Sequence, residues 1–284
     1  MLGSDTGQRM SPRVSVVIPV RNGMPFLAET LMSVRRQTRP AGEIVVVDNC
    51  STDGTREFVN SQPDIRVMNQ TQGVSAPANW TTAVQAATGD FVKVLCGDDV
   101  LLPNCLERQL DALLQHDGCV MASARRQVVG PDSTVLIKAI GHDGLRGVVS
   151  GEDSIRRGLS RGVNLYGEVS ALLFRTSVLQ SNLPWPDDAG YATDLAMYLK
   201  VLRHGDVYFD SEPLSQFRVT KSSWSFNVQS TQGRDVCAAY ARVRVEYPLN
   251  VSWHQRASGT FFAYGRQFLR SFFYLRVRKP KVSS

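Results

Sequence analysis

The stretch Lys93-Val94-Leu95-Cys96-Gly97-Asp98-Asp99-Val100-Leu101-Leu102-Pro103 joins an apolar strand to two adjacent carboxylates and then to a proline that opens a helical pattern. Neighbouring carboxylates repel each other unless a cation lies close by. Divalent cations prefer oxygen ligands and are often shared between protein carboxylates and substrate phosphates. The stretch therefore indicates nucleotide chemistry at a strand end. Capping of the following helix is the alternative role, because acidic side chains stabilise a helix N-terminus.

Short apolar runs like the one before Asp98 alternate with helical patterns through the first half of the chain. Pro25 and Pro103 each precede such a pattern, with leucines at helical spacing. This alternation predicts an α/β fold, a wound and mostly parallel sheet with helices on both faces. The predicted strands are Val14–Ile18, Ile44–Val47, Ile65–Met68, Phe91–Leu95 and Cys119–Ala124.

Polar residues follow three of these strands, at Pro19–Asn22, Asp48–Ser51 and Gly97–Asp99. Ligands of wound sheets bind beyond the carboxyl ends of the strands, so these clusters are expected to meet at one edge. Ser51, Thr52 and Asp53 are expected to build a turn and to cap the next helix.

The second half of the chain is less regular. It predicts a helix from Ser150 or Gly151 to Leu159, a strand near Val169–Phe174 and a helix around Asp194–Arg203. We divide the chain into a flexible tail (1–11), a nucleotide-binding half (12–125), an acceptor-binding half (126–225) and a helical extension (226–284).

Composition excludes several classes of protein. The 284 residues are 43% hydrophobic, contain no run of 18 apolar residues, and do not open on a signal-peptide pattern. The five cysteines lack a Cys-x-x-Cys pair, and the four histidines lack metal-ligand spacing. We expect a cytoplasmic protein without disulfides or structural zinc.

The net charge of +6 arises from the C-terminal extension. No Asp or Glu follows Glu246, whereas seven basic residues do: Arg256, Arg266, Arg270, Arg276, Arg278, Lys279 and Lys281. On a helix, one aromatic face forms opposite Arg266 and Arg270. Its members are Phe261, Tyr264, Phe268, Phe272 and Leu275, flanked by Phe262, Leu269 and Phe273.

Two interpretations of this face stay open. It packs on the catalytic domain or on a second subunit of a homodimer, or it lies on an anionic membrane surface, which would be the inner face of the cell membrane. Nucleic acid is not an expected partner, because the charge is confined to one end and no base-reading module is present.

Four motifs occur in a characteristic order: Val14–Asn22, Val45–Thr55, Ala86–Val92 and Asp98–Pro103. Together they closely resemble the bacterial family-2 glycosyltransferases, which have the GT-A fold and invert the anomeric centre. The resemblance covers roughly Arg13 to Lys221.

The resemblance implies roles on the nucleotide side. Pro19, Val20 and Arg21 would line the nucleoside pocket. Asp48 would hold the base, since a carboxylate can accept the imide N–H of uracil or thymine. Asp98 would face the ribose or share the metal, and Asp99 would bind the Mg²⁺ or Mn²⁺ that bridges the diphosphate.

It also implies roles in the second half. Asp194 would be the catalytic base, Glu168 would line the acceptor side, and Arg218 with Lys221–Ser223 would form a loop that closes over the diphosphate. The chain departs from the family at Thr193, where many relatives carry Glu, and at Ala76–Asn79, where Ala-Arg-Asn is common. An ordinary first-turn acid is the alternative role for Asp194.

We therefore expect a metal-dependent inverting transferase of cell-surface polysaccharide synthesis. It would move a sugar from a nucleoside-diphosphate sugar, UDP- or dTDP-linked, to a hydroxyl of a glycan or lipid-linked acceptor. A nucleotidyltransferase is one alternative, although Pro19–Gly23 makes a poor phosphate loop. A catalytically inactive sugar-nucleotide-binding scaffold is the other.

Overall fold

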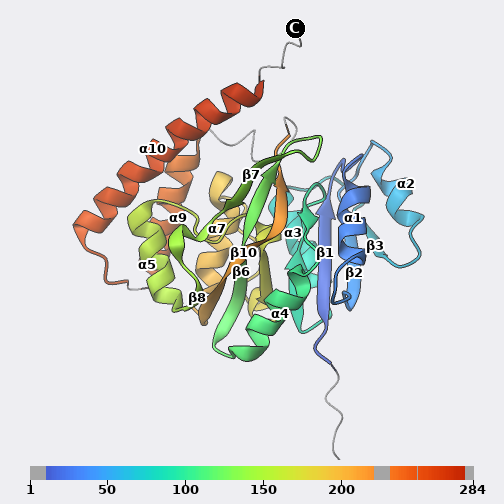
Figure 1. The fold of residues 1–284 in the computed structure, drawn as a ribbon, viewed down its shortest axis with the longest axis horizontal. Coiled ribbons are helices and arrows are strands. Elements are labelled where there is room, and N and C mark those ends of the chain that lie inside the picture. The colour runs from blue at the N-terminus through green and yellow to red at the C-terminus, as the bar shows by residue number, and fades with distance from the viewer. Residues whose placement is uncertain (1–10, 221–230, 248, 279–284) are drawn as a thin grey trace, which may run out of the picture.

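The computed structural model describes residues 11–220, 231–247 and 249–278, and Figure 1 labels its elements. The strands are β1 (Val14–Val20), β2 (Glu43–Asp48), β3 (Arg66–Asn69), β4 (Phe91–Val94), β5 (Val100–Leu101), β6 (Cys119–Val129), β7 (Val135–Ile140), β8 (Gly147–Val149), β9 (Leu172–Arg175) and β10 (Asp206–Arg218). The α-helices are α1 (Leu27–Arg35), α2 (Thr55–Asn60), α3 (Ala76–Gln85), α4 (Cys105–Gln115), α5 (Gly151–Arg161), α6 (Thr176–Ser181), α7 (Thr193–Val201), α9 (Gln232–Glu246) and α10 (Trp253–Arg278). Short 3₁₀ helices cover His142–Gly144, Val169–Ala171 and Gly190–Ala192.

A single mixed sheet organises the chain in the order β3-β2-β1-β4-β9-β6-β10-β5, with β7 added on β6 and β8 on β10. Strands β3, β2, β1 and β4 run parallel, as do β6 and β10. Strand β9 joins the two parts, since it pairs antiparallel with both β4 and β6. The chain winds outward from β1 to β3 and returns to β4 beside β1. In wound sheets, ligands bind at such a reversal.

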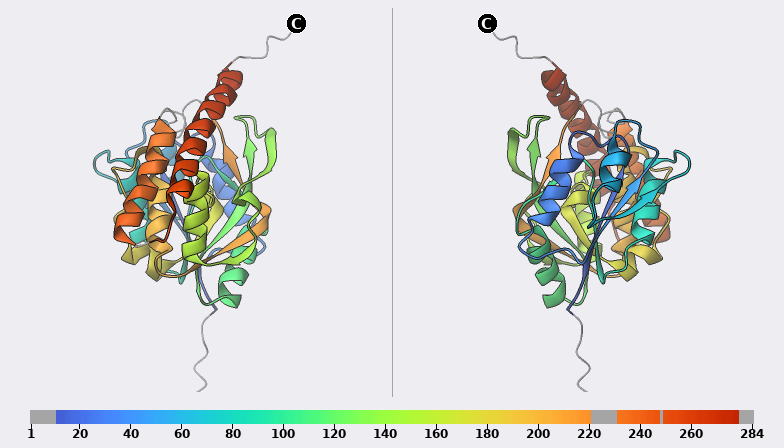
Figure 2. Two further views of the ribbon diagram at one scale, coloured as in Figure 1. Left: turned by 90° about the vertical axis from the view of Figure 1, so that its left-hand side faces the viewer. Right: turned by 90° about the vertical axis from the view of Figure 1, so that its right-hand side faces the viewer.

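Side chains of the central strands alternate between two hydrophobic clusters, one on each face of the sheet. In β1, Val17 belongs to one cluster, whereas Val16 and Ile18 belong to the other. Helices α3, α5, α7 and α9 complete the first cluster, and α1 and α4 complete the second. Figures 1 and 2 show these helices on opposite sides of the sheet. The predicted wound α/β sheet with helices on both faces is confirmed.

Element boundaries in the first half differ from prediction by only a few residues. The helices expected from Pro25 and Pro103 begin at Leu27 and Cys105, a difference within the ordinary uncertainty of helix ends. Strand β6 runs on to Val129, so the division expected between residues 125 and 126 falls inside a strand.

The second half departs further. The predicted strand Val169–Phe174 is wrong over its first three residues, which form a 3₁₀ turn. The amide of Ala171 donates to the carbonyl of Glu168 at 2.8 Å, so it is taken by a turn and not by the sheet. The sequence pattern also predicts no strand over 206–218, where the 13-residue β10 lies. Its register against β6 shifts after Asp206, Asp210 and Pro213, which interrupts the hydrophobic alternation.

The predicted C-terminal helical extension is present as α9 and α10. Figure 2 shows α10 lying across the outside of α5 and α9. The contact is backbone against backbone: a Cβ on Gly259 would lie 1.9 Å from the carbonyl oxygen of Leu159. Ala263, one turn later, is also buried. None of the helices in the described part of the chain is long and apolar enough to cross a membrane.

Through residue 269, the predicted aromatic face does not pack on the catalytic domain. The opposite face of α10, which carries Gly259 and Ala263, makes that contact. Aromatic and leucine side chains of α10 keep 46% to 75% of their surface exposed: Trp253, Phe261, Phe262, Tyr264, Phe268 and Leu269. The predicted members Phe272, Phe273 and Leu275 lie outside the described side chains.

Candidate active site

A cavity of about 730 Å³ opens at the carboxyl ends of β1, β2 and β4, where the chain reverses. Its walls come from the loop after β1, from the N-terminus of α3 and from the turn after β4. They include Pro19, Val20, Arg21, Asn49, Ser75, Trp80, Cys96 and Asp98. All three predicted polar clusters thus contribute to one edge of the sheet, as expected from the topology.

The loop after β1 is held by the turn after β2. Asn22 donates its backbone N–H to Ser51 Oγ at 2.8 Å, and its side-chain oxygen accepts from the amide of Thr52 at 2.9 Å. The Asp53 carboxylate accepts from the amide of Met24 at 2.9 Å and from the amide of Thr55 at 3.1 Å. Ser51, Thr52 and Asp53 therefore build a turn, as predicted, and brace the wall that carries Pro19–Arg21. The residue at the N-cap of α2 is Gly54, not one of these three.

Asp48 ends β2 directly before Asn49, which lines the cavity. Its carboxylate is fully buried and pairs with Arg56, whose Nε donates to Oδ2 at 2.9 Å. The amide of Ser51 also donates to Oδ1 at 3.3 Å. The structure thus places Asp48 at the predicted edge, while the wall of the cavity itself is formed by its neighbour.

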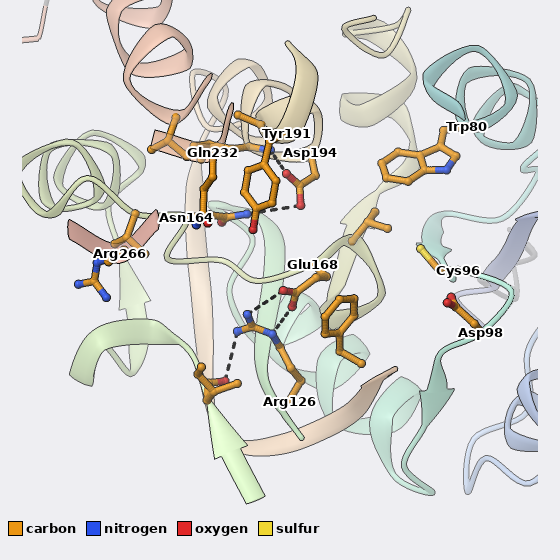
Figure 3. Close-up of a pocket in the computed structure, with 17 residues that line it drawn as sticks. Trp80, Cys96, Asp98, Arg126, Asn164, Glu168, Tyr191, Asp194, Gln232 and Arg266 are labelled. Atoms are coloured by element: carbon orange, nitrogen blue, oxygen red, sulfur yellow. Dashed lines mark hydrogen bonds and ion pairs between the residues drawn. The ribbon is translucent and has the colours of Figure 1, made fainter. Parts of the chain in front are cut away.

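A second cavity, of about 340 Å³, adjoins the first. Trp80, Cys96 and Asp98 line both. Figure 3 shows these three residues on one side of the second cavity and Asp194, Glu168 and Arg126 on the other. Two ligands bound in the two cavities would therefore meet at Asp98.

Asp194 lies in the first turn of α7 and faces the second cavity. Burial raises the pKa of its carboxyl to about 7, and the charge of Glu168 adds to this rise, while the amide of Leu195 opposes it by donating to Oδ1 at 2.7 Å. Asn164 Nδ2 donates to Oδ2 at 3.5 Å. Among the described residues, no cation lies within salt-bridge distance of this carboxylate. A carboxylate with a pKa near neutral pH suits general-base catalysis.

Glu168 differs from Asp194, since it is paired. Arg126 Nη2 donates to Glu168 Oε1 at 3.0 Å, and its Nε contacts the same carboxylate. Both side chains line the second cavity. Glu168 therefore faces the cavity as one half of an ion pair with Arg126.

The two adjacent aspartates have different surroundings. Asp98 lines both cavities, whereas Asp99 is 1% exposed and belongs to neither wall. The backbone amide of Arg218 donates to Asp99 Oδ1 at 3.0 Å. Burial and the neighbouring Asp98 carboxylate raise the pKa of Asp99 well above its ordinary value. Of the two carboxylates, only that of Asp98 therefore reaches the cavity walls.

The donor chemistry at this turn fits a divalent cation. Asp98 brings carboxylate oxygens to the cavity wall, and Asp99 Oδ2 is buried without a hydrogen-bond partner among the described residues. In that part of the chain no cluster of three His, Cys, Asp or Glu side chains could hold a metal ion. A cation here would take its remaining ligands from a diphosphate and water, as Mg²⁺ commonly does.

Arg218 is not in a loop, and the expectation that it closes over a diphosphate from a loop is wrong. It ends β10 and is fully buried. Its guanidinium donates to Glu29 Oε2 at 2.7 Å, to the carbonyl of Asp98 at 2.9 Å and to the carbonyl of Gly130 at 3.1 Å. Arg218 therefore fixes the Asp98–Asp99 turn from behind. Lys221, Ser222 and Ser223 lie outside the described residues.

Several residues of the second cavity carry no local sequence signal. Trp80 lies on α3, Arg126 on β6 and Asn164 in the loop after α5. Arg266 reaches the cavity from α10, the helix of the C-terminal extension. One sequence feature could have indicated this role. Arg266 lies opposite the aromatic face of α10, and the side of α10 opposite that face is the one that contacts the catalytic core.

Comparisons with known proteins identify the family of the chain. The family model of Glycosyl transferase family 2 matches residues 15–177. TuaG of Bacillus subtilis, a glycosyltransferase named for teichuronic acid biosynthesis, is 27% identical over 221 residues, which is 76% of this chain and 82% of TuaG. WfgD of Escherichia coli, a UDP-Glc:alpha-D-GlcNAc-diphosphoundecaprenol beta-1,3-glucosyltransferase, is 31% identical over 108 residues, 37% of this chain and 42% of WfgD.

Solved structures share the fold at lower identity. The crystal structure of S. aureus TarS 1-349 with UDP-GlcNAc has a TM-score of 0.65 at 20% identity, and the match covers 94% of this chain and 74% of that one. The mannosyltransferase PcManGT of Pyrobaculum calidifontis, solved with GDP-Man and Mn²⁺, has a TM-score of 0.59 at 19% identity, with coverage of 96% and 82%.

Proposed function

The chain belongs to glycosyl transferase family 2, and on that premise we propose that it transfers a sugar from a UDP- or dTDP-linked donor to a hydroxyl of a glycan or lipid-linked acceptor. The transfer would invert the anomeric centre and serve cell-surface polysaccharide synthesis. Membership in a family of glycosyltransferases decides against a nucleotidyltransferase. The relatives TuaG and WfgD, named for a cell-wall polymer and for a diphosphoundecaprenol acceptor, support the acceptor class.

One observation carries the proposal: two cavities meet at Asp98, and a carboxylate with a pKa of about 7 faces only the second. The larger cavity lies at the sheet reversal and suits a nucleoside diphosphate. The smaller one contains Asp194, which suits an acceptor hydroxyl. The sugar of the donor would then lie at the shared wall of Trp80, Cys96 and Asp98.

Asp194 acts on the acceptor. Its ionised carboxylate takes the proton of the acceptor hydroxyl, while the acceptor oxygen forms a bond to the anomeric carbon from the face opposite the diphosphate. The bond between the anomeric carbon and the diphosphate oxygen breaks in the same displacement, and its electron pair leaves with the nucleoside diphosphate. Asn164 orients Asp194 by its hydrogen bond to Oδ2.

Other residues bind the donor. Pro19, Val20 and Arg21 line the nucleoside side, and Asp48, which pairs with Arg56 behind the wall, would turn one carboxylate oxygen to the imide N–H of the base when the donor binds. Asp98 holds Mg²⁺ or Mn²⁺ when it is bound, and such an ion offsets the charge that develops on the departing diphosphate. The Mn²⁺ complex of PcManGT supports this cofactor. Arg218 keeps the turn of Asp98 in place through its hydrogen bond to the Asp98 carbonyl.

A thermal-shift panel with UDP, dTDP and GDP sugars, each with and without Mn²⁺, tests the donor. A ligand at 100 times its dissociation constant adds about 2.7 kcal/mol to stability. For a domain of this size that corresponds to a rise of the melting temperature of about 5–10 °C. Release of free nucleoside diphosphate in the presence of a polyprenyl-diphosphate-linked sugar tests the transfer. Donor binding without release with any acceptor of this class would favour an inactive scaffold.

A further inference from the structure

The outward face of α10 is an exposed apolar strip. Its described members Trp253, Phe261, Tyr264 and Phe268 recur at helical spacing, with Phe262 and Leu269 beside them. From Trp253 to Leu269 the strip runs for roughly 24 Å, at 1.5 Å per residue. Monomeric proteins rarely expose contiguous apolar surface of this extent, and where they do it marks an interaction site.

The strip belongs to a helix that is fixed to the catalytic core. Backbone contact at Gly259 and burial of Ala263 hold α10 on α5, and Gln267 Oε1 accepts from the amide of Gly233 in α9 at 2.8 Å. Phe261 and Phe268 are therefore the most exposed aromatic members of the strip, whereas the half-exposed Tyr264 lies at its edge with its ring against Gly233 of α9. Figure 2 shows α10 on the outside of the molecule.

Charge distinguishes the candidate occupants of this strip. Apart from Arg266, which lines the second cavity, the chain has six Lys and Arg residues after Glu246, and it has no Asp or Glu there. A second copy docking through the same strip would bring two such acid-free segments together, with no carboxylate in either to compensate. An anionic lipid surface supplies both the apolar interior for the aromatic rings and the negative charge for the cations.

We propose that the outward face of α10 docks the protein on an anionic lipid bilayer, with the helix lying in the plane of the interface. Amphipathic helices with aromatic side chains on one face and cations beside it bind membranes in this way. The same helix carries Arg266 into the wall of the second cavity. Membrane docking would thus fix the orientation of the acceptor cavity relative to the bilayer.

Co-sedimentation with vesicles tests the proposal on the full-length chain. The two vesicle types are phosphatidylcholine alone and phosphatidylcholine with phosphatidylglycerol. We expect binding to the anionic vesicles that is at least about tenfold stronger than to the neutral ones, because each cation near the surface contributes about fivefold. High salt should weaken the binding, since it screens the charges.

The double variant Phe261→Ser/Phe268→Ser should bind the anionic vesicles about tenfold or more weakly, since partial burial of each ring is lost. The control Leu136→Ser/Val148→Ser removes two apolar side chains of β7 and β8 that are each 46% exposed, and it should bind as the wild type does. All four side chains are exposed, so melting temperatures should be unchanged. Quenching of tryptophan fluorescence by brominated lipid, compared with Trp253→Phe, gives a second readout without disturbing the strip.

Three outcomes overturn the proposal. The wild type does not sediment with anionic vesicles at low salt, the serine variant sediments as strongly as the control, or brominated lipid quenches the wild type and Trp253→Phe equally. A wild-type dimer in light scattering that the serine variant converts to a monomer, without vesicle binding, would assign the strip to a subunit interface. Vesicle binding needs no sugar donor, so the result is independent of the transferase test.

Discussion

Replacing Asp194 by asparagine tests the catalytic base. The amide has the size of the carboxylate but cannot take the proton of the acceptor hydroxyl. Loss of a general base lowers kcat by roughly 10²–10⁴, equivalent to about 2.7–5.4 kcal/mol of activation free energy. Affinity for the nucleoside diphosphate should change by less than a few-fold, because Asp194 is absent from the wall of the larger cavity.

The pH dependence follows from the pKa of about 7. About half of the enzyme carries an ionised Asp194 at pH 7, and kcat of the wild type should fall about tenfold per unit below pH 6 and level off above pH 8. The residual kcat of Asp194→Asn should lack this dependence. Nucleoside diphosphate release, measured at saturating substrates across this range, gives both profiles.

The free energy of unfolding gives an independent readout. The contribution of Asp194 to it falls as the pH rises, whereas kcat increases. The pKa of Asp194 is raised above its unfolded value of 3.8, so protonation stabilises the fold. This stabilisation is complete below about pH 4 and is lost as the pH rises through 7. Asp194→Asn, which is always neutral, should therefore be more stable than the wild type at pH 8, by up to roughly 4 kcal/mol, and equally stable at pH 4.

Two results would refute the reasoning. If donor affinity and kcat fall together, Asp194 supports the structure of the site and is not its base. If Asp194→Asn gains no stability at pH 8 relative to pH 4, the raised pKa is wrong, and a pH-rate limb near 7 must come from another group.

Three further substitutions test other parts of the site. Asp98→Asn should remove the Mn²⁺-dependent part of UDP binding in calorimetry, because Asp98 is the carboxylate at the wall of both cavities; unchanged metal dependence would exclude Asp98 as a ligand. Arg218→Met should lower stability by about 2–4 kcal/mol in urea unfolding, since it removes the hydrogen bonds of a fully buried guanidinium to the carbonyls of Asp98 and Gly130 and its ion pair with Glu29; weaker UDP binding with unchanged stability would instead indicate that Arg218 contacts the diphosphate. Gly259→Ala should lower the melting temperature, as its Cβ would lie 1.9 Å from the carbonyl oxygen of Leu159, whereas Gly265→Ala on the same helix meets open space and should raise it slightly. Equal effects of the two alanines would contradict the docking of α10.

The first half of the fold could be predicted because its signals are local. Strands β1, β2 and β4 are continuous apolar runs, and a parallel sheet collects their carboxyl ends at one edge. The loop of Pro19–Arg21 and the turn of Asp98 therefore meet there without any knowledge of distant contacts. Which of two adjacent aspartates faces the cavity could not be predicted, because it depends on the amide of Arg218, 119 residues later in the chain.

The second half could not be predicted to the same depth. Bulges at Asp210 and Pro213 hide β10 from a period-two pattern, and so Arg218 is mistaken for a loop residue. For α10, the aromatic pattern identified an apolar face but could not show whether that face points to the core or to solvent. Gly259 and Ala263 determine which face contacts the core, since close contact of two helix backbones requires small residues. Such small residues do not stand out in a hydrophobicity pattern.

The separation in sequence between Arg218 and the residues that it holds has a consequence for folding during synthesis. The guanidinium ties together α1, the turn after β4 and the segment after β6, yet it comes from the last strand of the sheet. During synthesis the Asp98 turn leaves the ribosome some 120 residues before its support. We expect nascent chains that stop short of Arg218 to form the apolar strands of the first half but not a competent nucleotide site. The enzyme should therefore acquire its activity late in translation and in one step.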